Sequence, residues 1–210
     1  MLSIEKFSKA YSGTKIISID SLSLSSGIYW IKGENGSGKT TFFKSLAGLH
    51  PCEGKIQFDD GIDLHKNPIP FRTRVNYSEA EPVYPGFLTS KDLIRFIGKT
   101  KDADQKQQDY FVEQFNMSSY FEKPCDTYSS GMLKKLSLAI AFLGSPKLII
   151  LDEPLITLDV QARKVLLQIM ENYIQEHEVT FLLSSHQALE STDLKVNETF
   201  VIENKTLVKG

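Results

Sequence analysis

The 210-residue chain has little of several things that would place its class at once. Its two cysteines, Cys52 and Cys125, are too few for the disulfide framework of a small secreted protein. Its 24 lysines and arginines face 26 aspartates and glutamates, so no basic excess points to nucleic acid. The longest apolar run, residues 136–143, is much shorter than the roughly 20 residues of a membrane span. The N-terminus does not have the pattern of a signal peptide. We expect a soluble protein of a reducing cytosol, which would reach a membrane only through a partner.

What the sequence does contain is one complete phosphate-binding pattern, G-x-x-x-x-G-K-[ST]. An apolar run at 28–31 precedes it and a helix-like run at 41–47 follows, which is the strand–loop–helix context that the pattern requires. Backbone N–H groups of such a loop and the helix N-terminus form an anion site. We predict that Lys39 reaches the β- and γ-phosphates of a ligand and that Thr40 ligates Mg²⁺. The pattern and the next residue comprise Gly33, Glu34, Asn35, Gly36, Ser37, Gly38, Lys39, Thr40 and Thr41.

Two neighbouring carboxylates could complete this site. Asp152 and Glu153 directly follow the continuous apolar run 147–151, which predicts a strand buried on both faces. Ligands of open α/β sheets bind at the carboxyl ends of such strands. We predict Asp152 as a metal ligand and Glu153 as the base that activates water. The alternative is a solvated acidic turn before Pro154.

A histidine ends a second apolar run. His186 follows residues 181–185, so we predict that its imidazole contacts the γ-phosphate at the same sheet edge. The alternative is a structural or solvated histidine. The other histidines receive no role.

Apolar periodicity predicts how the remaining chain is organised. Residues 1–32 read as short strands around the apolar groups at 2–7, 16–19 and 22–24, with turns at 12–13 and 25–27. Residues 67–70 read as a rigid connector before a strand at 72–77. Helices are predicted at 90–97, 110–117 and 129–143, and the polar stretch 99–109 reads as a connector or the start of a helix. From residue 147 the pattern alternates between strands and a helix at 160–177, and a hairpin around residues 204–205 ends the chain. We see no interdomain linker and expect one domain over residues 1–210.

These ordered motifs resemble, over essentially the whole chain, the nucleotide-binding subunits of ABC transporters. Residues 33–41 match the Walker A motif, and residues 148–153 match Walker B with its catalytic glutamate. The segment 128–132 looks like the signature sequence and is joined to Walker B by a helix, which separates this chain from kinases and GTPases. Tyr11 matches the aromatic residue that stacks on adenine, and His186 matches the switch histidine. Asp159 matches the end of the D-loop. The part of the signature that contacts nucleotide in this family corresponds to Ser129, Ser130 and Gly131.

The resemblance implies a fold, an activity and partners. The fold would be α/β, a P-loop core of mainly parallel sheet and flanking helices, with an N-terminal antiparallel β subdomain and a helical subdomain at about 86–144. The activity would be Mg²⁺-dependent ATP hydrolysis that powers transport. ATP would lie between Walker A of one subunit and the signature of another. The partners would be membrane-spanning subunits and a second ATPase subunit, for which we expect a second copy, although a related subunit fits as well. The chain would then lie in the cytoplasm at the inner face of the membrane.

The sequence also departs from the family pattern. The Q-loop glutamine falls at Ala80, and we hypothesise that Glu79 or Glu81 replaces it; an unchanged Mg²⁺ dependence in the double alanine variant would contradict this. The exporter-like branch tolerates Ser130 and Met132 in the signature, so we predict an exporter, with aromatic residues of the 78–88 loop docking its membrane subunit. One alternative is a non-transport ABC ATPase acting on translation or DNA, although such proteins usually carry two nucleotide domains or a long insertion. Another, prompted by Ala80, is a regulator that barely hydrolyses ATP.

Overall fold

The computed structural model describes residues 1–185 and 194–210 and contains two β-sheets. The N-terminal sheet is antiparallel, with β1 (Leu2–Tyr11) between β2 (Thr14–Leu24) and β4 (Glu53–Phe58). The central sheet has the order β5-β6-β7-β3-β8-β9 and is parallel except for the final β8–β9 pair. Its strands are β3 (Gly27–Lys32), β5 (Val75–Ser78), β6 (Leu148–Leu151), β7 (Thr180–Ser184), β8 (Glu198–Glu203) and β9 (Thr206–Lys209).

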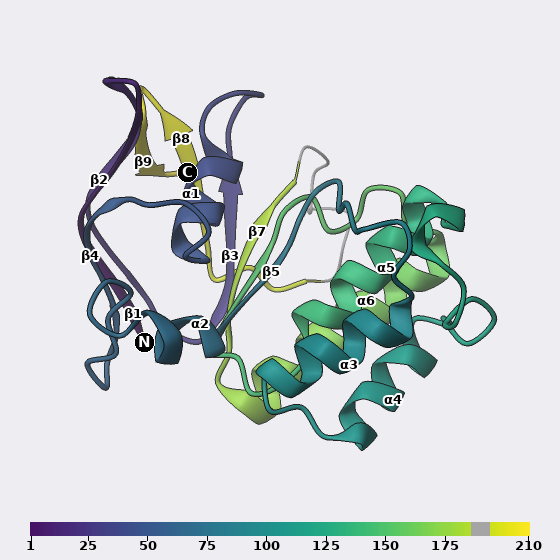
Figure 1. Cartoon of the computed structure of the whole chain (residues 1–210). Coiled ribbons are helices and arrows are strands. Elements are labelled where there is room, and N and C mark those ends of the chain that lie inside the picture. Colours follow the sequence, from purple (N-terminus) through teal and green to yellow (C-terminus); the bar gives the residue numbers. More distant parts are fainter. Residues whose placement is uncertain (186–193) are drawn as a thin grey trace.

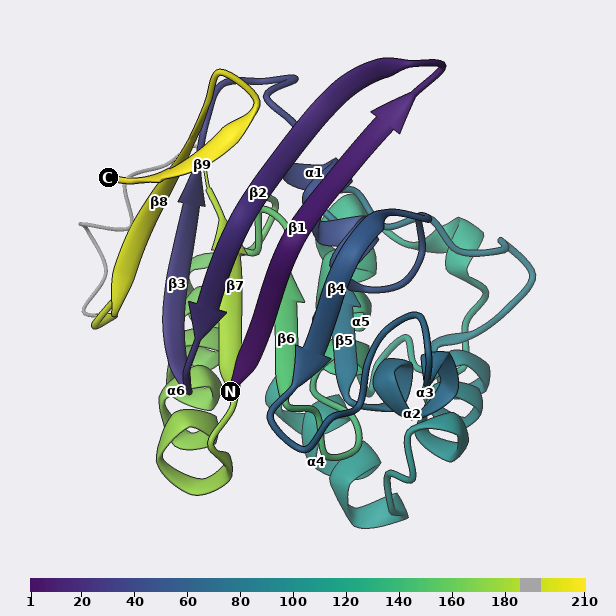
Figure 2. The ribbon, with the colours of Figure 1, turned by 90° about the vertical axis from the view of Figure 1, so that its left-hand side faces the viewer.

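The central sheet separates two hydrophobic cores. Strand β3 shows this by alternation, because Ile28 and Trp30 join one core while Tyr29 and Ile31 join the other. One face carries α1 (Lys39–Leu46), α2 (Pro68–Thr73) and the N-terminal sheet. The other carries α3 (Ser90–Thr100), α4 (Gln105–Gln114), α5 (Ser130–Ala141) and α6 (Val160–His177) (Figures 1 and 2). The α/β fold with an N-terminal antiparallel β subdomain is therefore confirmed. The division that treats residues 86–144 as a subdomain stays a prediction.

Two local predictions were wrong. Residues 14–24 form one strand instead of two short ones, because β2 stays paired with β1 along its length. The connector predicted at 67–70 begins helix α2, since a proline at the first helical position is already set for helical φ; the following strand starts only at Val75. Of the two possibilities for residues 99–109, a connector or a helix start, the structure shows a helix start at Gln105, where the Asp104 side chain accepts a hydrogen bond from the Gln107 N–H (2.7 Å).

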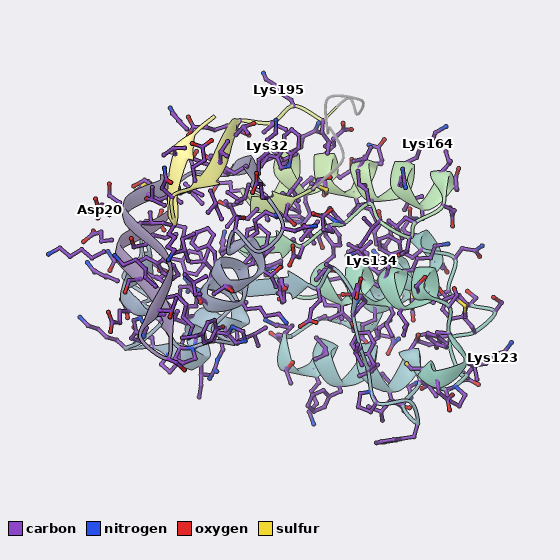
Figure 3. All side chains as sticks on the ribbon, turned by 90° about the horizontal axis from the view of Figure 1, so that it is seen from above. Asp20, Lys32, Lys123, Lys134, Lys164 and Lys195 are labelled. Atoms are coloured by element: carbon purple, nitrogen blue, oxygen red, sulfur yellow. The ribbon has the colours of Figure 1, made fainter. Side chains whose placement is uncertain are left out.

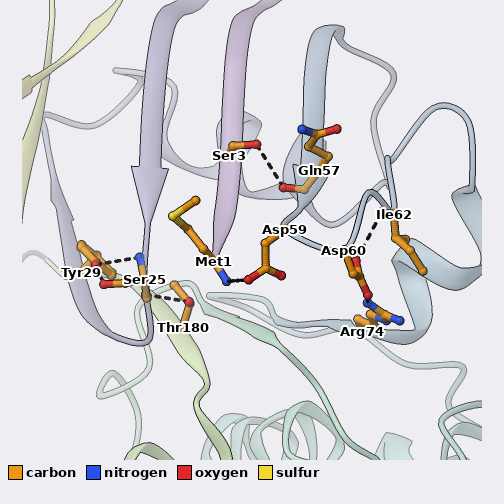
Figure 4. Close-up of polar contacts among 10 residues, drawn as sticks. All are labelled: Met1, Ser3, Ser25, Tyr29, Gln57, Asp59, Asp60, Ile62, Arg74 and Thr180. Carbon is orange, nitrogen blue, oxygen red and sulfur yellow. Dashed lines mark hydrogen bonds and ion pairs between the residues drawn. The ribbon is translucent and has the colours of Figure 1, made fainter.

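Polar contacts fasten the two sheets at the amino ends of β3 and β7 (Figure 4). Thr180 Oγ1 donates to the Ser25 carbonyl oxygen (2.8 Å), and the Ser25 N–H donates to the Tyr29 hydroxyl (3.1 Å). Nearby, the Met1 ammonium pairs with Asp59 (3.1 Å). The carboxyl ends of the parallel strands lie at the opposite end of the sheet, where the loop at 33–38 follows β3. Among the described residues, no helix is long and apolar enough to cross a bilayer.

Candidate functional site

The loop after β3 presents an open helix N-terminus. Helix α1 begins at Lys39. Gly38, directly before it, has a φ of 107°, a backbone conformation that would be energetically costly for a residue with a side chain. A Cβ on Gly38 would also lie 3.2 Å from Ile16 Cγ2, and one on Gly33 would lie 2.5 Å from Ser37 Oγ. No described side chain caps α1, so its first N–H groups are available to an anion.

Lys39 arches over this loop. Its Nζ donates to the carbonyl oxygens of Gly33 (2.7 Å) and Glu34 (3.0 Å). Burial lowers the pKa of Lys39, while the carboxylates of Glu153 and Asp152 act in the opposite direction. The ammonium thus lies within the loop and donates to neutral carbonyl oxygens. Charged phosphate oxygens, which accept stronger hydrogen bonds, could take the place of these carbonyl oxygens as acceptors.

The Asp152 carboxylate joins three elements at the end of β6. Oδ2 accepts a hydrogen bond from Thr40 Oγ1 (2.7 Å), and Oδ1 accepts one from Ser184 Oγ on β7. The Tyr77 hydroxyl lies 3.4 Å from Oδ2. Asp152 is only 1% exposed, so its negative charge is focused on the loop instead of being dispersed in water.

This pair of oxygen donors suits Mg²⁺. A hydroxyl and a carboxylate are hard ligands, and protein-bound Mg²⁺ usually takes one or two carboxylates and completes its shell with phosphate and water. The described residues hold no group of three His, Cys, Asp or Glu side chains that could enclose a metal alone. Thr40 and Asp152 therefore fit a metal shared with a phosphorylated ligand.

Glu153 has an unusual backbone. Its φ is +47°, a left-handed conformation that non-glycine residues seldom adopt and that costs about 1–2 kcal/mol. The Glu153 N–H donates to Ser184 Oγ (2.9 Å), and its side chain is nearly buried beside Asp152. Two predicted carboxylates thus lie together at the carboxyl end of β6. The predicted His186 lies outside the described residues.

A cleft of about 930 Å³ lies beside the phosphate loop. It is lined by residues 14–16 of β2, residues 33–37 of the loop and the β8–β9 turn at 203–205. Tyr11, predicted to stack on a base, is not among the lining residues. Its hydroxyl lies 2.9 Å from His50 Nδ1, and Lys9 Nζ lies 4.4 Å from its ring centre. His50, for which no role was predicted, is therefore a hydrogen-bond partner of Tyr11.

The predicted signature residues lie at the N-terminus of α5. Ser129 caps the helix by accepting from the Met132 N–H (3.3 Å), and both Ser129 and Ser130 are exposed. A Cβ on Gly131 would lie 2.9 Å from the Thr157 carbonyl oxygen. Figures 1 and 2 show α1 and α5 on opposite sides of strands β5, β6 and β7. The structure therefore places these residues apart from the loop at 33–41 within one chain.

Asp159 caps a different helix. Its carboxylate accepts from the Ala162 N–H at the start of α6 (2.8 Å) and pairs with Lys135 Nζ of α5 (2.6 Å). Both partners hold the pKa of Asp159 below its usual value, the Lys135 hydrogen bond most of all. Asp159 thus links the N-terminus of α6 to the signature helix.

Ala80, at the position of the Q-loop glutamine, is flanked in sequence by Glu79 and Glu81. Glu79 Oε1 pairs with Lys44 Nζ on α1 (3.2 Å), and Glu81 is exposed. The same loop borders an apolar cavity of about 360 Å³, lined by Tyr84, by residues 47 and 49 after α1, and by parts of β5, α3 and α5. Phe87, further along the loop, is 79% exposed.

Sequence reasoning missed two residues that touch the Asp152–Glu153 peptide. Ser184 ends β7 next to β6, and its place at the end of a buried strand was a usable signal. Lys134 of α5 donates from Nζ to the Asp152 carbonyl oxygen (2.8 Å). Nothing in the sequence distinguishes Lys134 from the exposed lysines around it.

Comparison with known proteins finds a matching family model and relatives named as ATP-binding proteins. Residues 19–156, more than half of the chain, match the model of the ABC transporter family. The chain is 28% identical to the ABC transporter ATP-binding protein YtrB of Bacillus subtilis over 99% of its own length and 70% of that protein. It is 29% identical to human ATP-binding cassette sub-family A member 2, of which it covers 9%, and 27% identical to the spermidine/putrescine import ATP-binding protein PotA of Mycoplasma mycoides, of which it covers 60%.

A solved structure supports the same fold. The ATP-binding subunit of an ABC transporter aligns with a TM-score of 0.88 and 24% identity, over 100% of this chain and 89% of that one. The relatives include a protein named for import, so similarity alone does not assign the chain to an importing or an exporting branch.

Proposed function

The chain belongs to the ABC transporter family as an ATP-binding subunit whose ATP hydrolysis energises transport, and from this premise we propose how its residues divide the work. Lys39 and the open N–H groups of α1 hold the phosphates of ATP. Thr40 and Asp152 hold Mg²⁺, which when bound offsets the charge that develops on the transferring phosphate. Tyr11 stacks on the adenine and His186 contacts the γ-phosphate, both by their place in the family motifs.

Glu153 is the proposed general base. The observation that carries this proposal is the Thr40–Asp152 contact of 2.7 Å, which fixes where metal and phosphate would lie, with Glu153 on the next peptide. The left-handed backbone at Glu153 turns the chain sharply after β6, so adjacent carboxylates leave the strand in different directions. One can then hold the metal while the other takes a proton from water.

A second copy of the chain would complete the nucleotide site. Ser129 and Ser130 are exposed at a helix N-terminus, a suitable site for an anion, yet α5 and α1 lie on opposite sides of the sheet (Figure 1). We therefore propose that Ser129, Ser130 and Gly131, with the nearby Asp159, face the ATP held by the partner's Walker A loop. ATP would bridge the two copies, and hydrolysis would let them separate.

A membrane-spanning subunit is the other proposed partner. The apolar cavity beside Tyr84 and the exposed ring of Phe87 offer a hydrophobic surface at the loop between β5 and α3. The chain would bind there at the cytoplasmic face of the membrane. The signature pattern at 128–132 supports an exporter. The direction of cargo movement in vesicles that contain both subunits tests this point.

Glu153→Gln tests the function directly. The amide keeps the shape of the side chain but cannot accept the proton, so ATP turnover should be lost while an ATP-bound dimer accumulates and elutes early in gel filtration. Glu176→Gln on the far end of α6 is the control, since Glu176 is an exposed carboxylate away from the site. Hydrolysis at the wild-type rate by Glu153→Gln would rule out the assigned base.

Ala80 favours one second candidate. A subunit without the Q-loop side chain could act as an ATP-dependent regulator with very slow turnover. Turnover close to zero in the wild-type chain, measured with its membrane partner, would support this candidate over the transport ATPase.

A further inference from the structure

Lys134 is a buried lysine in the signature helix. Its side chain is 0% exposed, and Figure 3 shows it in the interior while the labelled Lys123, Lys164 and Lys195 lie at the periphery. Burial lowers the pKa of Lys134 to about 8, while the carboxylates of Asp152, Glu153 and Glu79 act in the opposite direction. Burying an ammonium is unfavourable unless all its donors are paired. Its surroundings therefore need to supply three acceptors.

Three backbone carbonyl oxygens supply them. Lys134 Nζ donates to Glu79 (2.7 Å), Ala80 (3.3 Å) and Asp152 (2.8 Å). These residues follow the carboxyl ends of β5 and β6, which are neighbouring parallel strands. One ammonium thus ties the signature helix to both strand ends. It also holds the segment around Ala80, where the family's usual side chain is missing.

The contact with Asp152 involves a single peptide group. The C=O of the Asp152–Glu153 peptide accepts from Lys134, and the N–H of the same peptide donates to Ser184 Oγ (2.9 Å). This peptide joins the proposed metal ligand to the proposed base. Its two polar atoms are held from opposite sides, by α5 and by β7, so its plane cannot rotate while both contacts remain.

The held peptide is also where the backbone is strained. Glu153 has a φ of +47°, and such conformations persist only where the surrounding contacts enforce them. Without the Lys134 contact, the peptide could relax toward an ordinary conformation, and the Glu153 carboxylate would then point elsewhere. An apolar side chain would fill the same space but would not oppose this rotation.

We propose that Lys134 is a positioning residue for ATP hydrolysis, which orients the Asp152–Glu153 peptide and thereby couples the signature helix to the base. This inference rests on the proposed role of Glu153. Lys134 Nζ donates to backbone carbonyl oxygens, so its influence on ATP is indirect.

A graded series tests the proposal. Lys134→Met removes all donors, and Lys134→Gln keeps two N–H donors on a shorter side chain. The control is Lys101→Met, because Lys101 is a half-buried lysine that likewise donates to backbone carbonyl oxygens, those of Arg72 and Val75, away from the site. We expect kcat for ATP to fall about 10-fold or more in Lys134→Met, with KM within about 2-fold of wild type and Lys134→Gln in between. Lys101→Met should lower the melting temperature but keep kcat.

The proposal is overturned if Lys134→Met keeps kcat within twofold of Lys101→Met, or if its KM rises in parallel with the loss of kcat. Amide hydrogen exchange without nucleotide provides a second readout that does not depend on activity. Exchange in a peptide that spans residues 149–156 should accelerate in Lys134→Met and Lys134→Gln but not in Lys101→Met; equal exchange refutes the orienting role. A wild-type chain without ATPase activity would instead contradict the proposed function and leave the exchange test decisive for Lys134.

Discussion

Replacing Ser184 with alanine should disturb both carboxylates of the site at once. The Ser184 hydroxyl is completely buried, donates to Asp152 Oδ1 and accepts from the Glu153 N–H (2.9 Å). Alanine leaves that N–H buried without this partner and removes one donor from a buried carboxylate. No water can readily take the place of a hydroxyl in so closed a position.

The size of the effect follows from these two contacts. An unpaired buried donor costs about 1–3 kcal/mol, and a hydrogen bond to a charged group contributes about 1.5–3 kcal/mol. Because one oxygen makes both contacts, we expect their loss to lower the free energy of unfolding by about 3 kcal/mol. If misplacement of the Glu153 peptide adds about half of this free energy to the activation barrier, kcat for ATP falls about 10-fold, since 1.4 kcal/mol corresponds to one order of magnitude.

Urea unfolding and steady-state ATP hydrolysis, measured on the same preparations, check both numbers. Thr180→Val is the matched control, because Thr180 lies at the other end of β7 and donates to the Ser25 carbonyl oxygen (Figure 4). It should lose about 1 kcal/mol and keep its ATPase activity. The reasoning is wrong if Ser184→Ala matches Thr180→Val in stability and hydrolyses ATP as fast as wild type.

Two further predictions concern the segment between the signature helix and α6. Gly131→Ala should lower the free energy of unfolding by about 1–3 kcal/mol, because the alanine Cβ would lie 2.9 Å from the Thr157 carbonyl oxygen. Ser130→Ala is the control. Equal urea midpoints of the two variants would contradict the close contact. Asp159 has a lowered pKa in the folded chain, so its ionised form stabilises the fold above about pH 4 and this contribution disappears as the pH falls through the folded pKa. The difference in urea midpoint between wild type and Asp159→Asn should therefore shrink from pH 7 to pH 3, and a constant difference would exclude the ion pair with Lys135 as its source.

The parts of the site that lie at strand ends could be predicted from sequence. Thr40 follows the loop after β3 and Asp152 follows β6, and both are strands of one parallel sheet, so their side chains had to emerge at the same edge. The structure brings them to 2.7 Å. The class of fold could be predicted as well, because continuous apolar runs such as 147–151 occur where both faces of a strand are covered.

Contacts made by long side chains between distant elements could not be predicted. Whether Lys134 is exposed depends on how α5 rotates against the sheet, and the helical period alone does not separate Lys134 from Lys135. Tyr11 shows a related limit. The motif predicts that Tyr11 stacks on the adenine of a nucleotide, but its contact with His50 depends on where the chain returns after α1.

The signature helix contacts the segment 152–159, which begins in Walker B and continues beyond it, at three points. Lys134 holds the Asp152 carbonyl oxygen, Gly131 packs against Thr157, and Lys135 pairs with Asp159. Within this segment Glu153 and Thr157 both have positive φ (47° and 61°), and the latter is β-branched, for which such a conformation is a strong outlier.

Strain at these two positions gives the segment an alternative, relaxed backbone, and the three contacts with α5 oppose it. In the proposed dimer, the N-terminus of α5 faces the ATP of the other copy. A nucleotide that shifts α5 at one site would therefore change the restraint on Glu153 at the second site. Loss of cooperativity between the two sites in Lys134→Met, with ATP binding retained, would be the kinetic sign of that connection.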